Sequence, residues 1–346
     1  MVATNKDPVL AVFSLSGGND FMNTVIPYTN PLYRDYRPTL AVAEDQVVPI
    51  NDELAFHPAM ASLKKYWDEG KLAIILGVGY PHPSLSHFRS MDIWATCEPD
   101  ELGLTGWLGS VIQDVDPNGE NVLTGVNFGR GLPRAMALTG VPVASVAVLE
   151  GYGVLTGIPG QDQRARALDV FERMYSPAIG TGATMDYLGR TGLDALKGAD
   201  ILKTAADSYS STVEYAATPI AQSLRGMAQV ILKGLGTRVL YTSQGGYDTH
   251  ANQVPVQTPL LSDLSAGIGD FFTDLREHDA ADNVMMLVFT EFGPRVKDNG
   301  SGSDHGSGGA SYLIGQPVNG GMLGAYPSLK EEDQLDGDLH FNVDFR

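Results

Sequence analysis

Cysteine, basic residues and long apolar runs are all scarce in this chain, and each shortage excludes a class of protein. Cys97 is the only cysteine, so the chain can form neither an intrachain disulfide nor a thiolate metal cluster. Lys and Arg number 23 against 41 Asp and Glu, which gives a formal charge of −18 and leaves no basic cluster for nucleic acid to bind. No apolar run approaches the ~18 residues that a membrane span requires.

The rest of the composition is that of a globular protein rich in loops. The chain has 346 residues, 43% of them hydrophobic, with 40 Gly and 20 Pro, so it can bury a large core. We expect a single domain over residues 1–346. The polar opening from Met1 to Asp7 leads directly into an apolar run. Such a start fits either a cytoplasmic protein or a mature chain whose leader has been removed.

Strand-like and helix-like segments alternate along the chain. Apolar, often β-branched runs predict buried strands at 9–15, 72–77, 143–149, 239–242 and 284–290. Apolar residues at helical spacing predict helices at 57–71, after Ser86, and at 260–275. Further helices at 161–175 and 193–235 would form a covering layer at about 160–235. This alternation predicts an α/β fold, with a mostly parallel sheet and helices on both faces.

Acidic and histidine side chains, together with one serine, follow the predicted strands. They lie in the segments Ser16–Asp20, Ser86–Arg89, Gly245–His250, Glu291–Gly293 and Asp304–Gly306. In an open parallel sheet the carboxyl ends of the strands face a common crevice, so these segments are expected to converge. Carboxylates, imidazoles and a hydroxyl at one edge are what a metal-assisted hydrolase requires.

Ser86 stands between a turn-forming Pro81-His82-Pro83 segment and a predicted helix, and two roles stay open for it. Serine is a preferred N-cap, which is a purely structural role. A helix N-terminus also stabilises negative charge, so a serine there is well placed to act as a nucleophile. His87 and Arg89 would then supply a proton-transfer group and an anion clamp.

Metal ligands are predicted in the later segments. Asp248 and His250 lie two residues apart in extended backbone, so both side chains can reach one cation. Divalent metals such as Zn²⁺ or Mn²⁺ accept mixed carboxylate and imidazole ligands. Glu291 follows a buried run, and His305 lies in a Gly- and Ser-rich loop with few packing partners. Asp20 closes a Gly-Gly turn, where it is either a further carboxylate ligand or the cap of a turn.

Seven short motifs carry a resemblance to a known family. They are Leu15–Asp20, His57–Pro58, Ser86–Trp94, Gly106–Gly109, Tyr247–His250, Thr290–Gly293 and Ser303–Gly306. Together they resemble the bacterial family called domain of unknown function 1501, a branch of the alkaline phosphatase and sulfatase superfamily. The resemblance spans nearly the whole chain and is weakest over residues 135–235. It implies a three-layer sandwich like that of alkaline phosphatase.

The resemblance also implies roles for individual residues. Superfamily enzymes place one or two divalent cations among acids and histidines that follow successive strands, beside a Ser, Thr or Cys nucleophile. Carried over to this chain, one metal position would be formed by Asp20, Ser86 and Glu291, and the other by Asp248, His250 and His305. The superfamily's usual Asp-His pair appears here as Glu291-Phe292, which removes one imidazole ligand. Asp304 is the residue that could compensate for it.

Family members resemble exported proteins, often with twin-arginine leaders, and their genes commonly lie beside another uncharacterised secreted family. A periplasmic or secreted location is therefore implied, and a partner from that second family stays open. The usual leader is absent from this sequence. The family pattern also continues into a terminal helix beyond Arg346, so we expect a trimmed chain.

Two functions from different classes stay open. The first is an exported metal-dependent hydrolase that acts on a phosphate or sulfate ester of a small molecule or glycan, with Ser86 as nucleophile and Zn²⁺, Mn²⁺ or Ca²⁺ bound. The second is a non-catalytic, metal-stabilised exported protein that binds a glycan or a partner. A metal-independent serine esterase is disfavoured, because the sequence has no Gly-x-Ser-x-Gly motif.

Overall fold

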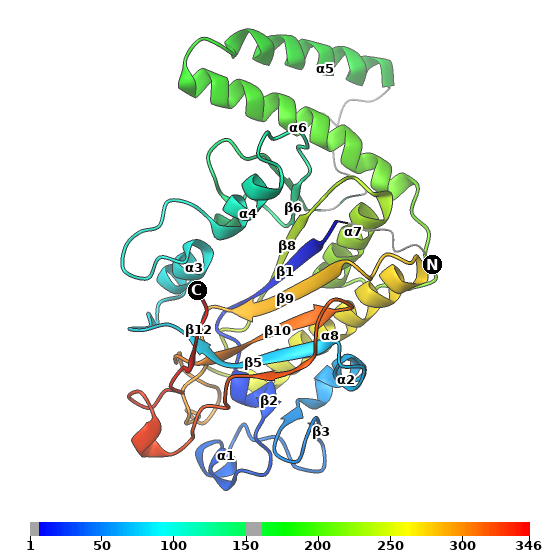
Figure 1. Cartoon of the computed structure of the whole chain (residues 1–346). Coiled ribbons are helices and arrows are strands. Elements are labelled where there is room, and N and C mark those ends of the chain that lie inside the picture. Colours follow the sequence, from blue (N-terminus) through cyan, green and yellow to red (C-terminus); the bar gives the residue numbers. More distant parts are fainter. Residues whose placement is uncertain (1–6, 148, 150–160) are drawn as a thin grey trace.

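The structure, a computed structural model, describes residues 7–147, 149 and 161–346. A nine-stranded sheet forms the centre of this part of the chain (Figure 1). The strand order is β11-β5-β10-β9-β1-β8-β6-β7, with β12 beside β5. The strands are β1 Val9–Ser16, β5 Leu72–Gly79, β6 Gly125–Phe128, β7 Val143–Val146, β8 Val239–Gly245, β9 Val284–Thr290, β10 Gly309–Gly315, β11 Gly321–Leu323 and β12 Val343–Asp344.

The sheet is mostly parallel, as the sequence predicts. Strand β1 pairs in parallel with β8 and β9, and β6 continues the parallel series from β8 to β7. Among the strands that the structure describes in this sheet, only β10 runs antiparallel, between β9 and β5. The sequence pattern did not reveal β10, because its short apolar run begins inside the Gly-rich segment that otherwise indicates a loop.

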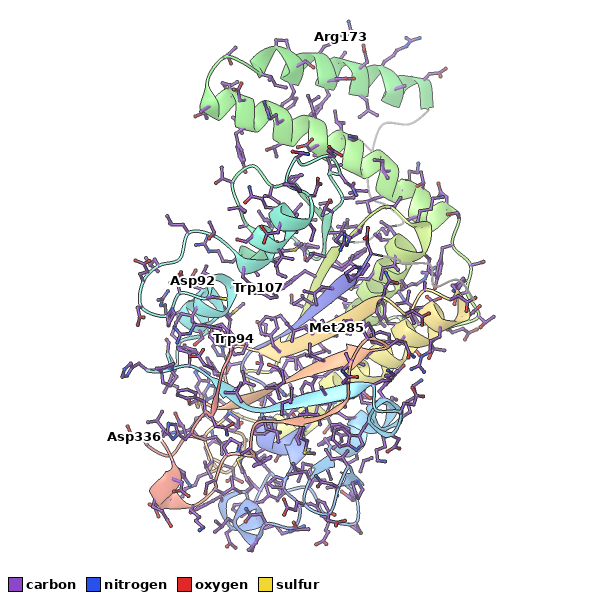
Figure 2. The ribbon with its side chains drawn as sticks, viewed as in Figure 1. Asp92, Trp94, Trp107, Arg173, Met285 and Asp336 are labelled. Atoms are coloured by element: carbon purple, nitrogen blue, oxygen red, sulfur yellow. The ribbon has the colours of Figure 1, made fainter. Side chains whose placement is uncertain are left out.

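Helices cover both faces of the sheet, which confirms the predicted α/β class. One face packs against the 3₁₀-helix η2 Pro58–Leu63 and the helices α2 Lys64–Asp68, α7 Pro219–Lys233 and α8 Gln253–Glu277. The other packs against α3 His87–Thr96, α4 Trp107–Val115 and η3 Arg134–Met136. In β1 the side chains alternate accordingly, with Phe13 and Leu15 in the first core and Val12 in the second. Figure 2 shows Trp94 on the second face, where its ring stacks on Phe289 of β9.

The predicted helical region at about 160–235 contains three long helices. Helices α5 Gln161–Tyr175 and α6 Ala183–Asp207, joined through η5 Ser176–Ala178, form a pair at one end of the sheet, near β6 (Figure 1). Helix α7 follows and packs on the sheet itself. The strand predicted at 143–149 is observed as β7 and ends at Val146. Position 148 of that prediction lies outside the described residues.

A small antiparallel sheet adjoins the core on the first face and is seen in the lower part of Figure 1. It contains β2 Val25–Ile26, β3 Val48–Pro49 and β4 Ala55–Phe56, next to η1 Phe21–Asn23 and α1 Pro31–Tyr36. The 3₁₀-helix η6 Glu331–Asp333 lies near the C-terminus. Of the helices that the structure describes, none is long and apolar enough to cross a membrane.

The topology brings distant segments to one edge of the sheet. Strands β1, β5, β8 and β9 run in the same direction, so their carboxyl ends lie together. The antiparallel β10 begins at this edge, which places the loop before it there as well. The predicted chemical segments therefore share this edge of the sheet.

Candidate metal centre

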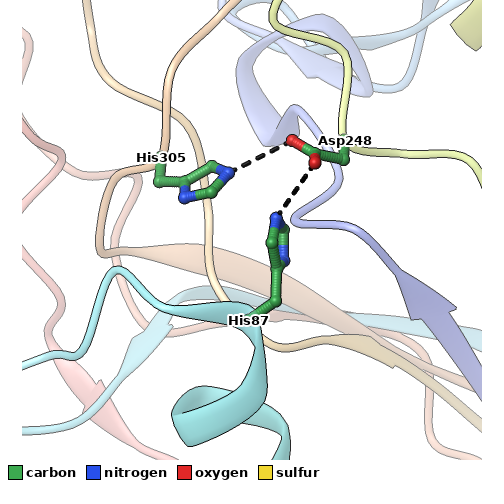
Figure 3. A group of neighbouring side chains, drawn as sticks. All are labelled: His87, Asp248 and His305. Atoms are coloured by element: carbon green, nitrogen blue, oxygen red, sulfur yellow. Dashed lines mark hydrogen bonds and ion pairs between the residues drawn. The ribbon is translucent and has the colours of Figure 1, made fainter.

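Three histidines meet one aspartate at the carboxyl edge of the sheet. Asp248 Oδ1 lies 3.0 Å from His250 Nε2 and 3.1 Å from His305 Nε2, while its Oδ2 lies 3.4 Å from His87 Nε2. Figure 3 shows the His87 and His305 rings pointing at the two oxygens of this carboxylate. His87 begins α3, Asp248 and His250 follow β8, and His305 precedes β10. Four residues from two loops and the start of a helix thus converge on one point.

Each histidine ring also makes a hydrogen bond through Nδ1, on the side away from Asp248, and this bond determines its tautomer. His305 Nδ1 lies 2.7 Å from the Leu85 carbonyl, which can only accept, so Nδ1 carries the proton. In the same way, His250 Nδ1 donates to Asp304 Oδ1 at 2.9 Å and His87 Nδ1 donates to Glu291 Oε1 at 2.9 Å. In its neutral form each ring therefore presents the lone pair of Nε2 to the cluster.

This arrangement fits a bound cation. The Nε2 atoms of His250 and His305 are 2.8 Å apart, where two lone pairs repel unless a proton or a metal ion lies between them. His87 Nε2 is buried and has no hydrogen-bond partner among the described residues. Ligand atoms of His87, Asp248 and His305 all lie within 4.8 Å of one another. Imidazoles held by carboxylates or carbonyls through Nδ1 are typical of metal ligands.

Glycines allow the loops to approach so closely. Gly17, at the end of β1, has φ +123°, and a Cβ there would collide with the backbone of Tyr247 and Asp248. Gly302, in the loop before β10, packs against the backbone of Thr249 and His250. A larger residue at either position would push the segment carrying Asp248 and His250 away from its partners.

The cluster is open to solvent on one side, where a substrate could reach it. The side chains of Asp248 and His250 are 48% and 45% exposed, whereas His87 and His305 are 25% and 22% exposed. Partial burial raises the pKa of Asp248, but the hydrogen bond that the protonated His305 ring donates, together with the positive charge of the protonated His87, His250 and His305 rings, outweighs it and lowers the pKa overall. The hydrogen bond from His250, followed by that from Asn299, lowers the pKa of Asp304. Both carboxylates are therefore ionised at neutral pH.

The comparisons with known proteins identify the family. Residues 163–342, just over half of the chain, match the family described as "Protein of unknown function (DUF1501)". The chain belongs to this family. No curated protein matches the sequence.

Solved structures similar to this DUF1501 chain have low sequence identity to it. The C-terminal periplasmic domain of EcEptC from Escherichia coli, in complex with Zn, has a TM-score of 0.42 and 9% identity, and the match covers 90% of this chain and 74% of that one. A protein of the alkaline phosphatase superfamily from Vibrio parahaemolyticus has a TM-score of 0.37, 8% identity and coverages of 94% and 64%. The 2-O GAG sulfatase BT1596 has a TM-score of 0.38, 9% identity and coverages of 94% and 66%.

Glu291 and Asp304, predicted as ligands from the sequence, lie behind the histidines in this DUF1501 structure. Glu291 is 3% exposed, and its Oε1 accepts hydrogen bonds from Gly17 N at 2.8 Å and from His87 Nδ1. Asp304 Oδ1 accepts from His250 Nδ1 and from Asn299 Nδ2 at 3.0 Å. In these positions they orient the rings and raise the basicity of Nε2.

Replacing Glu291 by Gln tests whether Glu291 orients the His87 ring or binds the metal directly. The amide keeps the shape but lacks the negative charge behind His87, so we expect metal affinity to fall by about 10- to 100-fold, with metal still bound at saturation. Competition with a chelator of known affinity measures the change. Glu44→Gln, in an exposed pair with Arg34, is the matched control and should leave affinity unchanged. Complete loss of metal in Glu291→Gln would instead make Glu291 a direct ligand.

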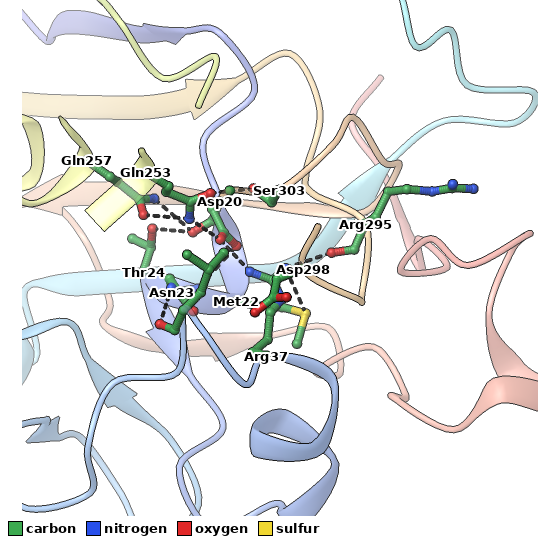
Figure 4. Close-up of polar contacts among 12 residues, drawn as sticks. Asp20, Met22, Asn23, Thr24, Arg37, Gln253, Gln257, Arg295, Asp298 and Ser303 are labelled. Atoms are coloured by element: carbon green, nitrogen blue, oxygen red, sulfur yellow. Dashed lines mark hydrogen bonds and ion pairs between the residues drawn. The ribbon is translucent and has the colours of Figure 1, made fainter. Parts of the chain in front are cut away.

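Asp20 lies in a separate buried network (Figure 4). Its Oδ2 accepts from Arg37 Nη1 and from Gln253 Nε2, both at 2.5 Å, and its Oδ1 accepts from Asn23 N at 3.3 Å. The side chains of Asp20 and Arg37 are both fully buried. Arg37 also donates to the carbonyls of Val296 at 2.7 Å and Arg295 at 2.6 Å, so this pair links η1 to the loop after β9. The metal role predicted for Asp20 stays a prediction.

Loss of this buried ion pair should destabilise the protein strongly. Asp20→Asn and Arg37→Ala each leave one partner uncompensated, and we expect the free energy of unfolding to fall by about 3–5 kcal/mol in each case. Lys64→Ala, which removes an exposed i,i+4 pair with Asp68, is the control and should cost about 0.5 kcal/mol or less. Chemical denaturation measures all three variants. Asp20→Asn should keep its metal; a variant that is stable but binds no metal would show that Asp20 is a ligand.

Ser86 and Arg89 lie on either side of the cluster residue His87 at the start of α3. Ser86 is the N-cap residue, but its hydroxyl makes no capping hydrogen bond and the residue is exposed. Arg89 donates to Asp92 Oδ2 at 2.8 Å and to the carbonyls of Glu98, Pro99 and Glu101, and so holds the segment after α3. The Ser86 hydroxyl is therefore available for chemistry, whereas the Arg89 guanidinium is already bound.

A second group of possible ligands lies at the end of α8, away from this edge. It consists of Asp274, Glu277 and His278. Asp274 Oδ2 accepts hydrogen bonds from Tyr209 at 2.7 Å and Tyr215 at 2.9 Å, and His278 Nδ1 donates to the Asp274 carbonyl at 2.8 Å. These bonds give the group a structural role in joining α8 to the segment after α6.

Proposed function

We propose that this protein is an exported metal-dependent hydrolase of phosphate or sulfate esters. The supporting observation is the convergence of the His87, His250 and His305 Nε2 lone pairs on Asp248. These four residues would hold one divalent cation. An imidazole-rich set suits Zn²⁺, and Mn²⁺ next, better than Ca²⁺, which takes oxygen ligands. Export is supported by the family resemblance alone.

The residues around the cluster support ester hydrolysis. A bound divalent cation would polarise a phosphoryl or sulfuryl oxygen and stabilise the negative charge that develops there. Ser86 is exposed beside His87, and the Leu85 carbonyl before it accepts a hydrogen bond from His305. Ser86 is thus the chain neighbour of a cluster residue, at the N-terminus of α3, where helix N–H groups favour an anion. We propose Ser86 as the nucleophile that attacks phosphorus or sulfur.

The non-catalytic alternative has one observation in its favour. Phe292 occupies the position where the superfamily usually has a histidine, and its ring packs 4.9 Å from the His87 ring and 4.8 Å from the His305 ring. A phenyl ring offers no ligand atom, so the cluster provides for one cation. A single metal that only stabilises the loops would serve a glycan- or partner-binding protein equally well.

Turnover of simple esters separates these two functions. The purified protein, loaded with Zn²⁺ or Mn²⁺, is assayed with 4-nitrophenyl phosphate, 4-nitrophenyl sulfate and a panel of alkyl esters, before and after treatment with EDTA. The hydrolase proposal expects release of phosphate or sulfate that EDTA abolishes and added metal restores. Metal-loaded protein that hydrolyses none of the esters would support the binding protein instead.

A further inference from the structure

A cavity of about 450 Å³ lies beside the metal cluster and has no role in the hydrolysis proposed above. It is enclosed by α3, by the segment 129–135 after β6, and by the carboxyl halves of β1, β8 and β9. The cavity reaches the cluster at Glu291, which is part of its lining and accepts the hydrogen bond from His87 Nδ1. A ligand in this cavity would therefore have one end close to the proposed cation.

The floor of the cavity is polar where the same sheet face is elsewhere apolar. Ser14 and Ser243 lie side by side on β1 and β8, and Asn127 on β6 is next to Tyr241. In β1 and β8, Val12 and Val239 precede these residues on that face, within the apolar core under α3 and α4. Polar groups weaken packing against a helix. The Asn127 amide nitrogen already donates to the Gly131 carbonyl at 2.8 Å, whereas the amide oxygen and the hydroxyls can form hydrogen bonds with the hydroxyls of a bound ligand.

An exposed aromatic ring stands at the rim. Phe88, in the first turn of α3, is 91% exposed, so it contributes little to the stability of the fold. Leu132, across the cavity, is 53% exposed. The face of a phenyl ring carries negative partial charge, which attracts the positively polarised C–H groups on one face of a sugar ring. An aromatic ring above hydroxyl and amide groups thus matches the two kinds of surface of a pyranose.

The rim also carries a positive charge that is not paired with any described residue. In the described part of the chain, the Arg130 guanidinium makes no hydrogen bond or ion pair, although the whole protein has a formal charge of −18. Arg134, on the same wall, is by contrast bound to Asp92 Oδ1 at 3.3 Å and to the carbonyls of Gly103 and Leu104. A free guanidinium beside a sugar-sized cavity can bind a carboxylate, sulfate or phosphate group.

We propose that this cavity binds the sugar that carries the ester, and that the substrate class is a carbohydrate ester with a second anionic group. Phe88 stacks on the sugar ring, the hydroxyl and amide groups of the floor bind its hydroxyls, and Arg130 binds the second anion. The assignment of the bound sugar as a substrate rests on the proposed hydrolase function.

Glucuronic acid tests the cavity directly, because it combines a sugar ring with an anion that no hydrolase can remove. Its binding is measured by saturation-transfer NMR beside glucose, which lacks the charge, and benzoate, which lacks the sugar. We expect glucuronic acid to bind more tightly than either. Phe88→Ala should weaken the binding of both sugars by about tenfold. Arg130→Gln should lower the affinity for glucuronic acid to that for glucose and leave the affinity for glucose unchanged.

Controls and the metal-free protein separate this inference from the hydrolase function. Leu104→Ala, at a residue that is 85% exposed, and Arg166→Gln on α5 lie outside the cavity lining and should change nothing. Binding of glucuronic acid should survive removal of the metal by EDTA. Equal binding of benzoate, no binding of either sugar, or loss of binding with EDTA but not with Arg130→Gln would each overturn the cavity proposal. Sugar binding by a protein that takes up no metal would instead overturn the hydrolase and leave the cavity as a glycan-binding site.

Discussion

Replacing Asp248 by Ala is expected to abolish stoichiometric metal binding. Asp248 is the residue that all three histidines contact, at 3.0, 3.1 and 3.4 Å, and no other carboxylate of the described chain contacts more than one of them. Its loss removes a ligand and the only negative charge between the rings. The affinity should therefore fall by more than the roughly 10- to 100-fold that is typical of residues which only orient a ligand. His305→Ala should have the same effect.

Equilibrium dialysis with Zn²⁺ and Mn²⁺, followed by elemental analysis, measures this loss. His340→Ala is the matched control for the histidine change, because His340 is exposed and makes no contact with the cluster. Circular dichroism should show both site variants folded, since Asp248 is half exposed and outside the core. Unchanged metal stoichiometry in a folded Asp248→Ala variant would contradict the proposed ligand set.

The second large effect is expected for Ser86→Ala. If Ser86 is the nucleophile, the change should reduce kcat for 4-nitrophenyl phosphate or sulfate by about 1,000-fold or more while leaving the metal content unchanged. The hydroxyl makes no capping hydrogen bond, so its removal should alter the free energy of unfolding by less than the ~1 kcal/mol of a typical N-cap. Steady-state kinetics and denaturation of the same preparation give both numbers.

Ser84→Ala is the control for Ser86→Ala. It lies in the same turn, its Oγ accepts a hydrogen bond from Ser86 N at 3.3 Å, and it is less exposed. A modest loss of activity in Ser84→Ala beside a large loss in Ser86→Ala would support the nucleophile. Full activity in Ser86→Ala would contradict it and identify water as the attacking group.

Much of the fold could be predicted because its strands are strongly apolar. The runs at 9–15, 72–77, 239–242 and 284–290 all lie in the observed sheet as β1, β5, β8 and β9. Their parallel order could be inferred from the helices between them. Strand β10 could not be predicted, because a glycine-rich sequence before a short apolar run is compatible with either a loop or a strand. Its antiparallel direction is what brings the loop with His305 to the carboxyl edge.

For the candidate site, too, the sequence predicts some residues and contacts but not others. The two-residue spacing links Asp248 with His250, and the family resemblance adds His305 to them; the structure brings the three together. The sequence predicts a proton-transfer role for His87, since nothing in it shows that the first turn of α3 points Nε2 of this residue at Asp248. The partner of Asp20 could not be foreseen either, because Arg37 lies 17 residues away in a different loop. Both facts depend on how helices and loops pack, and neither depends on local sequence pattern.

The metal content of the wild-type protein tests the proposal most directly. The protein is stripped with a chelator, dialysed separately against Zn²⁺, Mn²⁺ and Ca²⁺, and analysed for bound metal per chain. The geometry of His87, Asp248, His250 and His305 predicts one equivalent of Zn²⁺ or Mn²⁺ and little or no Ca²⁺. A protein that retains no stoichiometric metal under any of these conditions would contradict both the metal centre and the hydrolase function built on it.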